Sequence, residues 1–192
     1  LTEYDFKAVN SGEVVLEEMN NDRPVGMNGL VMNTRRDIFN NRNVRLALSY
    51  AYDHEWINKT MYQNAYVRTD SYFDNSPLAS SGLPSKEELE LLDVWKDQIP
   101  SEVFTETFIP PTTDGSGNDR KNLLKAKEIL EKEGWIVENG KLFKDGQEFK
   151  FEFLIVSPSD EKIALAYQSN LKKLGITMDV RTCLLYTSPS PR

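Results

Sequence analysis

The sequence predicts an α/β fold, and three patterns indicate it. A short apolar run is followed by an amphipathic helix within residues 30–52, and a hairpin motif lies near residue 140. An alternating apolar strand is then followed by a helix and a second strand within residues 148–181. Strand, helix and strand in that order form a βαβ unit, which favours parallel strands and a right-handed crossover. We therefore expect a mixed sheet flanked by helices.

Two short apolar runs in the first part of the chain are expected to be strands. The run at 12–16 is rich in valine and leucine, and the run Leu30–Met32 follows a proline and a glycine. Short apolar runs bounded by turn residues are typical of strands.

A helix is predicted from about Asn43 to Tyr52. The asparagines at 40, 41 and 43 suit its start, because short amide side chains can cap backbone N–H groups that have no partner within the helix. Apolar residues then recur at helical spacing and give one stripe for a core. These residues are Val44, Ala47, Leu48, Ala51 and Tyr52.

The segment 64–83 loses periodicity and carries aromatic residues among charged ones. A long loop of this composition is either a binding loop or disordered, and its aromatic residues argue against disorder. We interpret it as a ligand-presenting loop; the alternative is that its aromatic residues anchor it to its own domain. The candidate ligand contacts are Arg68, Asp70, Tyr72 and Phe73.

A capping box at Ser85 and Glu88 predicts the next helix, which presents Leu89, Leu92 and Trp95 and is ended by Pro100. A loop rich in proline, threonine and glycine follows at 104–118. Its Gly-Ser-Gly at 115–117 lacks the Gly-Lys-Ser/Thr ending of a phosphate loop, so it is interpreted as a flexible turn.

The last third of the chain alternates helices and strands. A helix from about residue 120 to 133 places Leu123, Ala126, Lys127 and Leu130 on one face and stops at Gly134. Asn139-Gly140 predicts a type I′ hairpin turn, and Asp145-Gly146 a second turn. The alternating strand 148–156, a helix at 160–174 and a strand at 176–181 complete the unit.

Composition excludes several functions. The net charge of −7 argues against binding to nucleic acid or to an anionic membrane, because both need basic surface. No apolar run approaches 18 residues, so no membrane insertion is expected. His54 is the only histidine, and no Cys, His and Asp cluster has metal-ligand spacing. We therefore expect no enzyme activity, no metal and no cofactor.

The segment from Asn33 to Asp53 carries a family resemblance. Asn-Thr-Arg-Arg after the apolar run, Phe39, the sequence NVRLAL at 43–48 and Ala-Tyr-Asp at 51–53 resemble the extracytoplasmic solute-binding proteins of family 5. Those proteins are the peptide-binding components of ABC importers. RTDSYFDNSPLASSGLPS at 68–85, EVFT at 102–105 and TDGSGN at 113–118 are similar to the YejA-like branch, which is associated with uptake of oligopeptides and microcin C.

The similarity covers about Tyr4 to Thr182 and implies one lobe of a two-lobed, periplasmic-binding-protein type fold. Residues 1–25 would be the end of an inter-lobe segment and residues 26–182 a partial ligand-binding lobe. The family usually has an acidic and an aliphatic residue where this chain has Asn41-Arg42. The cap of the helix at 43–52 is therefore not carried over from the family.

The resemblance also implies a site and partners. The strand at 30–33 borders the ligand cleft in that family, which makes Met32 and Asn33 candidate contacts, partly through their backbones. Arg35 and Arg36 could bind a peptide carboxylate, or could form a solvated turn or a structural salt bridge. The expected ligand is an oligopeptide or peptide-like compound, delivered in the periplasm to the membrane permease by a monomeric protein with an export signal upstream.

Two other functions stay open at this point. One is a stand-alone interaction module with Tyr72 and Phe73 at a protein interface. The other is a hydrolase that uses scattered carboxylates.

Residues 183–192, CLLYTSPSPR, resemble the in-frame translation of a sequencing adapter from a transposase library. We expect a non-native tail and exclude it from fold reasoning. The alternative is a natural disordered tail rich in serine and proline.

Overall fold

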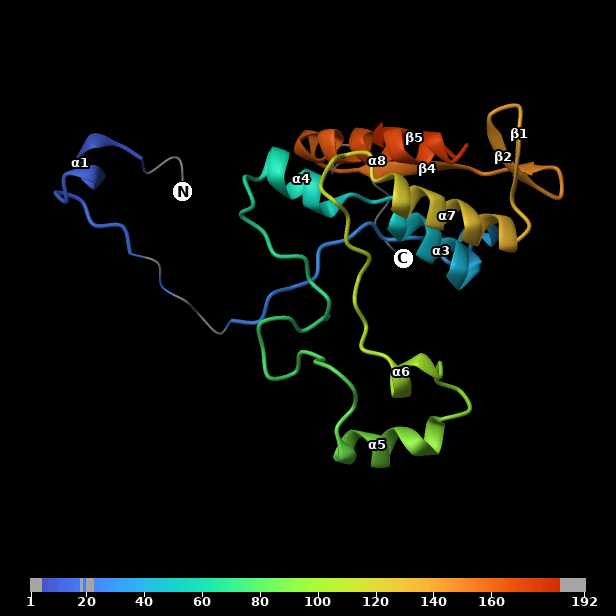
Figure 1. Cartoon of the computed structure of the whole chain (residues 1–192), viewed down its shortest axis with the longest axis horizontal. Coiled ribbons are helices and arrows are strands. Elements are labelled where there is room, and N and C mark those ends of the chain that lie inside the picture. Colours follow the sequence, from blue (N-terminus) through green and yellow to red (C-terminus); the bar gives the residue numbers. More distant parts are fainter. Residues whose placement is uncertain (1–4, 18, 20–22, 184–192) are drawn as a thin grey trace.

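The computed structural model describes residues 5–17, 19 and 23–183. Its helices and strands are shown in Figure 1. The helices are α1 (Lys7–Asn10), α2 (Asp37–Asn40), α3 (Arg42–Tyr50), α4 (His54–Met61), α5 (Lys86–Leu92), α6 (Glu102–Thr105), α7 (Arg120–Lys132) and α8 (Glu161–Lys173), with 3-10 turns η2 (Asp93–Trp95) and η3 (Pro158–Asp160). The strands are β1 (Ile136–Glu138), β2 (Lys141–Lys144), β3 (Gln147–Glu148), β4 (Lys150–Ile155) and β5 (Thr177–Thr182).

The expected α/β class and the βαβ unit are confirmed. Strands β4 and β5 pair in parallel, from Lys150 opposite Thr177 to Ile155 opposite Thr182, and α8 connects them. A separate antiparallel sheet has the order β1-β2-β3. Mixed strand directions with helices packed on the sheet are what the sequence predicts.

The predicted hairpin turn is also present. Asn139 and Gly140 both have positive φ, at 49° and 79°, as a type I′ turn requires. The turn sets Glu138 opposite Lys141 and Ile136 opposite Phe143.

Helix α3 forms because its start is capped and one face is apolar. The Asn41 side chain accepts hydrogen bonds from the N–H groups of Asn43, at 2.7 Å, and Val44. Asn41 therefore supplies the cap that the family pattern left open. Val44, Ala47 and Leu48 on the predicted stripe are buried.

One continuous core joins α2, α3, α7 and α8 to the strands. Aromatic rings meet edge to face within it: Phe39 and Phe151 have ring centroids 5.1 Å apart. Trp135 and Phe149 are 4.5 Å apart with tilted rings. The main buried side chains are Ile38, Phe39, Val44, Leu48, Leu130, Trp135, Leu142, Phe149, Phe151, Tyr167, Leu171 and Met178.

Two buried hydrogen bonds tie α8 to the end of α3. The Tyr167 hydroxyl donates to the Leu48 carbonyl at 3.0 Å, and the Asn170 amide donates to the Ala51 carbonyl at 3.2 Å. The last carbonyls of a helix have no partner inside the helix, so the Asn170 amide satisfies the Ala51 carbonyl just past the end of α3. The Leu48 carbonyl also accepts from the Ala51 N–H, at 3.2 Å, and it gives the buried Tyr167 hydroxyl an acceptor.

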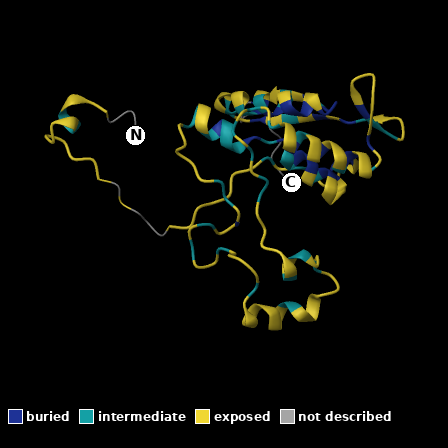
Figure 2. Ribbon diagram, in the orientation of Figure 1, coloured by how far each residue is buried: buried dark blue, intermediate teal, exposed yellow. Residues whose placement is uncertain are grey.

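The rest of the chain extends away from this core (Figure 1). The segment that carries α1 runs out on one side, and α5 and α6 lie apart from the body. Figure 2 shows that dark-blue buried residues gather in the body, while α5 and α6 are mostly yellow. Neither α1, α5 nor α6 contains a buried residue.

The predictions of strands at 12–16 and 30–32 are wrong. Neither run forms a strand pair with any described residue, so both are extended or bent chain without ladder hydrogen bonds. Leu30 and Met32 do pack against the core, whereas Val31 is 93% exposed. The alternation of a strand is therefore present at 30–32, but a pairing partner is missing from the described residues.

Three smaller expectations also need correction. The capping box at Ser85 and Glu88 is confirmed, but α5 ends at Leu92 and its apolar residues are not buried. Lys127 is exposed instead of lying on the buried face of α7. Helix α6, which the sequence did not predict, ends at Thr105 and so covers the beginning of the loop expected at 104–118.

The proposed boundaries at residues 25 and 182 stay predictions. Residues 1–4, 18 and 20–22 of the expected inter-lobe segment, and 184–192 of the expected tail, lie outside the described residues. Cys183 is buried, and its N–H donates to the Ile155 carbonyl at 2.8 Å. Helices α7 and α8 have 13 residues each, and no helix in the described part is long and apolar enough to cross a bilayer.

Gly175 offers a test of this packing. Its φ is +81°, and a Cβ there would lie 3.0 Å from the Leu142 nitrogen and 3.1 Å from the Lys141 carbonyl carbon. We expect Gly175→Ala to lower the free energy of unfolding by about 2–4 kcal/mol, since it adds a backbone clash to the strain of positive φ. Urea denaturation of the chain measures the change.

Gly140→Ala is the matched control. Gly140 has nearly the same φ, +79°, but nothing within 4 Å of an added Cβ. It should cost only about 1 kcal/mol, the strain of the left-handed conformation alone. Equal losses for the two variants would contradict the close approach of Gly175 to β2.

Candidate functional site

Three connecting segments leave the body, one toward α1 and two toward α5 and α6 (Figure 1). We call residues 23–33, 64–83 and 107–118 the strap surface. The second and third segments are the outgoing and returning legs of one long excursion from the body (Figure 1). None of the three contains a helix or a strand.

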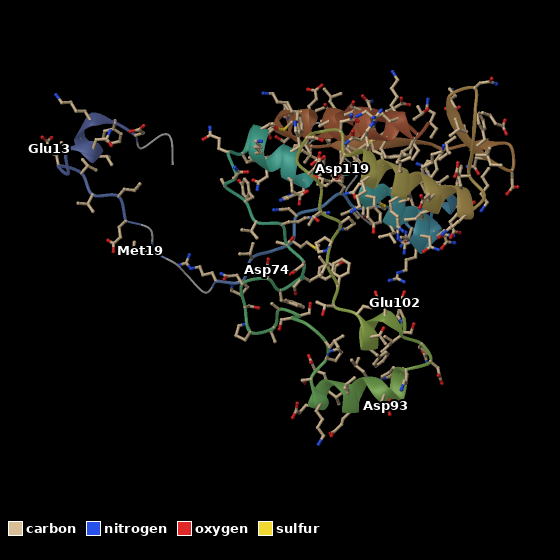
Figure 3. The ribbon with its side chains drawn as sticks, viewed as in Figure 1. Glu13, Met19, Asp74, Asp93, Glu102 and Asp119 are labelled. Atoms are coloured by element: carbon tan, nitrogen blue, oxygen red, sulfur yellow. The ribbon has the colours of Figure 1, made fainter. Side chains whose placement is uncertain are left out.

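Hydrogen bonds hold the first segment to the second. The Val25 N–H donates to the Asp74 carbonyl at 2.9 Å, and the Asn75 side chain donates to the Arg23 carbonyl at 2.8 Å. Figure 3 labels Asp74 close to where these two segments meet. Residues about 50 positions apart in sequence are thus joined into one surface.

The two legs of the excursion are joined near their base. The Arg68 guanidinium donates to the Pro111 carbonyl across the legs. The Asn58 side chain on α4 donates to the Tyr66 carbonyl at 2.5 Å and accepts from the Tyr66 N–H at 3.1 Å. These bonds fix where the outgoing leg leaves the body.

The loop 70–80 displays aromatic side chains outward. The buried Ser71 hydroxyl accepts hydrogen bonds from the N–H groups of Phe73, at 3.3 Å, and Ser80, at 3.1 Å. The loop therefore folds around Ser71. Tyr72 and Phe73, which flank this turn, are 78% and 56% exposed. Phe108 on the returning leg is exposed as well.

A buried carboxylate anchors the base of the returning leg. Asp53 accepts hydrogen bonds from the N–H groups of Trp56, at 3.0 Å, and Gly117, at 2.8 Å. The first bond caps α4 and the second holds the 113–118 turn. The predicted flexible turn is therefore an anchored one.

The Thr113 hydroxyl completes this anchor. It lies within hydrogen-bonding distance of both the Asp53 and the Glu55 carboxylates, and the Thr113 N–H donates to Glu55 at 3.0 Å. One hydroxyl carries one proton, so it donates to one carboxylate at a time. We call Asp53, Glu55, Thr113 and Gly117 the latch.

Glycine is required at the latch. Gly117 has a φ of +76°, and a Cβ there would lie 2.9 Å from the Trp56 indole nitrogen. The turn therefore packs directly on the Trp56 ring. Any side chain at position 117 would push the turn and the ring apart.

Burial perturbs two charged groups beside the latch. It lowers the pKa of the Arg68 guanidinium, and the Glu55 carboxylate opposes that shift. Burial also lowers the pKa of His54, and the Arg68 charge lowers it further. His54 is the first residue of α4, beside the Asp53 cap.

The structure separates the predicted site residues into two groups. Asp70, Tyr72 and Phe73 lie together on the outgoing leg, and Asp70 is exposed. Met32 and Asn33 lie where the first segment reaches α2, with Met32 half-buried against the core. No hydrogen bond joins the two groups in the described part of the chain.

Asn33 and the two arginines form a turn. The Asn33 side chain accepts from the Arg35 N–H at 3.1 Å, and its carbonyl accepts from the Arg36 N–H at 3.0 Å. Both arginine side chains are exposed. Arg68, by contrast, is half-buried, and its guanidinium donates a hydrogen bond to the Pro111 carbonyl.

Sequence reasoning missed the latch. The composition of TDGSGN suggested a turn, but its dependence on Asp53 could not be inferred, because the bonded residues are 60 and 64 positions apart. An aspartate directly before a helix was the available signal, since that position favours a cap.

The remaining clusters and cavities do not indicate chemistry. No group of three or more His, Cys, Asp or Glu residues able to hold a metal ion occurs among the described residues. A pocket of about 200 Å³ lies between α2, α3 and the hairpin, lined by Asp37, Asn41, Trp135 and Lys144. A second, of about 160 Å³, lies behind the latch beside Trp56 and Tyr167. Both are smaller than typical ligand pockets, which have volumes of about 300–1,000 Å³.

Comparisons of this chain with known proteins agree on one family. A model of the bacterial extracellular solute-binding proteins, family 5 Middle, matches residues 2–188. The chain is 41% identical over 181 residues to the peptidoglycan-binding protein YepA of Agrobacterium fabrum, covering 93% of this chain and 29% of that protein. It is 41% identical over 186 residues to the probable peptide-binding protein YejA of the same species, covering 95% and 30%.

A solved structure shows the same fold at low sequence identity. NikZ from Campylobacter jejuni, crystallised in complex with Ni(L-His), matches with a TM-score of 0.59 and 19% identity, over 81% of this chain and 26% of that one. The chain thus spans under a third of the length of the relatives that it matches.

Thr113 allows the latch to be tested. We expect Thr113→Val to lower the free energy of opening of the 113–118 turn by about 1–3 kcal/mol, because the buried Asp53 and the half-buried Glu55 carboxylates lose the hydroxyl that they share. Hydrogen exchange at the Gly117 amide should become about 5- to 150-fold faster.

Thr105→Val is the control. The Thr105 hydroxyl donates only to the exposed Ser101 carbonyl, at 3.3 Å, and the change in side chain is identical. It should leave exchange at Gly117 unchanged. Unchanged exchange in the Thr113 variant as well would show that the latch does not anchor the turn.

Proposed function

The chain belongs to the bacterial extracellular solute-binding proteins of family 5, in their YejA-like branch, and from this we propose that the full-length protein captures oligopeptides or peptide-like compounds for an ABC importer. The observation that carries the proposal is the strap surface. It presents the exposed aromatic side chains of Tyr72 and Phe73 on a loop folded around Ser71, and the returning leg is held to the body by the latch.

The chemistry of this surface suits a peptide. Extended segments can offer N–H and C=O groups to a ligand backbone in strand-like fashion. Tyr72 and Phe73 can pack on apolar ligand side chains, and Asp70 can pair with a ligand amine. At the other end, Met32 and Asn33 can supply backbone contacts and Arg35 a partner for a carboxylate. Arg68 is bonded to Pro111 and would position the loop.

The relatives narrow the ligand class. One is named as a peptidoglycan-binding protein and another as a probable peptide-binding protein. Peptides derived from peptidoglycan satisfy both descriptions. We therefore propose short peptides, including cell-wall peptides, as the ligands to test first.

The wider role follows from the family. Capture would take place in the periplasm, in a cleft between this lobe and a second one. Closure about a hinge would present the loaded, monomeric protein to the membrane permease. Closure is favoured only if the ligand contacts the closed form better than the open one. Residues 26–182 would supply one side of the cleft, and residues 1–25 the end of the connection to the other.

Binding without turnover distinguishes this proposal from the two alternatives. A hydrolase would convert the peptide into products. A stand-alone module would bind its partner at full affinity with residues 1–182 alone. The solute-binding proposal requires the full-length protein and leaves the peptide unchanged.

A thermal-shift screen of the full-length protein tests the function. Peptide pools, including peptidoglycan digests, should raise the melting temperature, because a ligand that binds the native state stabilises it by mass action. Tyr72→Ala and Phe73→Ala should each weaken the affinity for the best peptide by about 5- to 100-fold, since each removes about 1–3 kcal/mol of aromatic contact. Isothermal titration gives the affinity, and mass spectrometry shows whether the peptide is intact.

Leu124→Ala serves as the control variant. Leu124 is an exposed apolar residue on α7, away from the strap surface. It should bind peptide as the unchanged protein does. Cleaved peptide, or no shift with any pool, would refute the proposed function.

A further inference from the structure

The excursion ends in a small helical arm that the proposed ligand site does not explain. The arm, residues 84–106, contains α5, η2 and α6. It is well formed locally. Ser85 and Glu88 make a complete capping box, and Lys96 lies 5.9 Å from the centre of the Phe104 ring.

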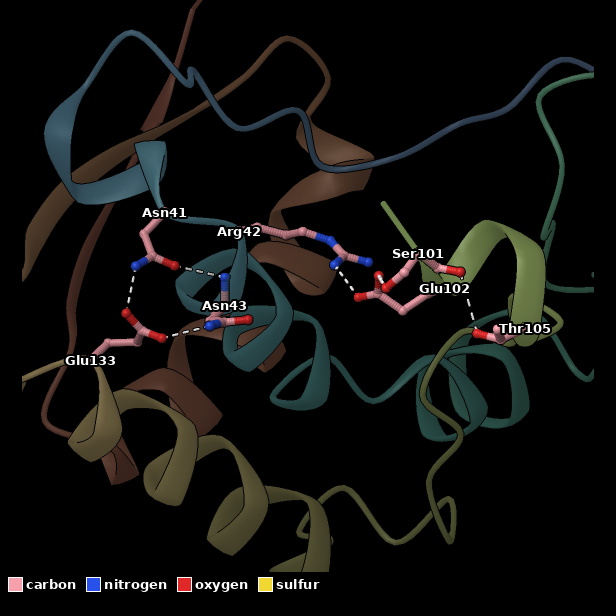
Figure 4. Close-up of polar contacts among 7 residues, drawn as sticks. All are labelled: Asn41, Arg42, Asn43, Ser101, Glu102, Thr105 and Glu133. Carbon is pink, nitrogen blue, oxygen red and sulfur yellow. Dashed lines mark hydrogen bonds and ion pairs between the residues drawn. The ribbon is translucent and has the colours of Figure 1, made fainter. Parts of the chain in front are cut away.

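The arm is tied to the body by an ion pair. Arg42, at the start of α3, contacts Glu102 on α6 at 2.7 Å, as Figure 4 shows. Both side chains are largely exposed, and exposed ion pairs contribute at most about 1 kcal/mol. This contact orients the arm but does not account for its stability.

No side chain of the arm is buried by the described residues. Leu91 and Val94 are 74% and 78% exposed, and Trp95 is exposed beside them. Leu91 lies near the end of α5, and Val94 and Trp95 lie in the adjoining η2. We call these three exposed residues the apolar patch. Helices shorter than about 12 residues are marginal in water unless an apolar face is packed. Neither α5 nor η2 contains a buried residue, so we expect another surface to cover the patch.

The net charge of the arm argues against a second copy of the arm as the surface that covers the apolar patch. Residues 84–106 contain seven acidic and two basic side chains, a net charge of −5. Two such arms would repel each other, which disfavours a second copy of this face. The favoured receiving surface is apolar at its centre, with lysine and arginine around it.

We propose that the apolar patch of Leu91, Val94 and Trp95 docks on another part of the same full-length protein, outside these 192 residues. The chain covers only 29% of the length of the YepA relative and 30% of the YejA relative. Most of the folded surface available to the arm is thus outside this chain. A tethered surface is also favoured over a free partner, because it is present at high effective concentration. The inference rests on family membership and not on the identity of the ligand.

Hydrogen exchange of the full-length protein, followed by mass spectrometry, tests the docking. Amides of Leu89 to Trp95 should exchange at least about 100-fold more slowly than those of an unprotected chain. Replacing Leu91 and Val94 together with glutamate should remove this protection. Lys86→Gln, in the same helix but outside the patch, should retain it.

Three outcomes would overturn the inference. One is rapid exchange of the arm in the unchanged full-length protein. Another is protection that disappears on dilution together with a dimer mass in light scattering, which would assign the patch to a second copy. The third is protection that survives the double substitution.

Peptide binding is measured on the same samples. A protected arm without peptide binding would count against the proposed function alone. Peptide binding with an unprotected arm would count against the docking alone.

Discussion

The fold depends on two hydrogen bonds that connect distant parts of the chain. Tyr167 and Asn170 on α8 donate to the last carbonyls of α3, in each case across 119 residues of sequence. Because these groups are buried, breaking either bond leaves an unpaired polar atom in the core. The βαβ unit therefore holds α3 in place, and α3 leads through α4 into the excursion. The position of the strap surface therefore depends on this contact.

The latch fixes the excursion relative to this helix. Asp53 follows α3 directly, caps α4 and accepts from Gly117, so one carboxylate fixes both ends of the excursion relative to the core. Arg68 adds a second link a few residues further out, between the legs. Beyond these points many side chains of the segments are exposed. The result is a hydrogen-bonded base with accessible loop side chains.

Patterns that depend on near neighbours were predictable from the sequence. The stripe of α3, the capping box at Ser85 and the Asn139-Gly140 turn each involve residues a few positions apart, and all three are present. The runs at 12–16 and 30–32 were misjudged because a strand exists only with a partner, and the described residues supply none. At the site, the sequence indicated the loop that carries Tyr72 and Phe73. It could not indicate that Arg68 faces inward, since that depends on Pro111, 43 residues away.

The anchoring of both ends of the excursion bears on how such proteins diversify. For a flexible segment with fixed ends, each doubling of length costs only about 0.6 kcal/mol of closure entropy. Insertions and deletions between Met61 and Arg120 would thus change folding energetics little, provided that Asp53, Thr113 and Gly117 are retained. Evolution could enlarge, trim or replace the exposed segments while leaving the scaffold intact. The latch would then anchor loops of many different lengths to the same scaffold.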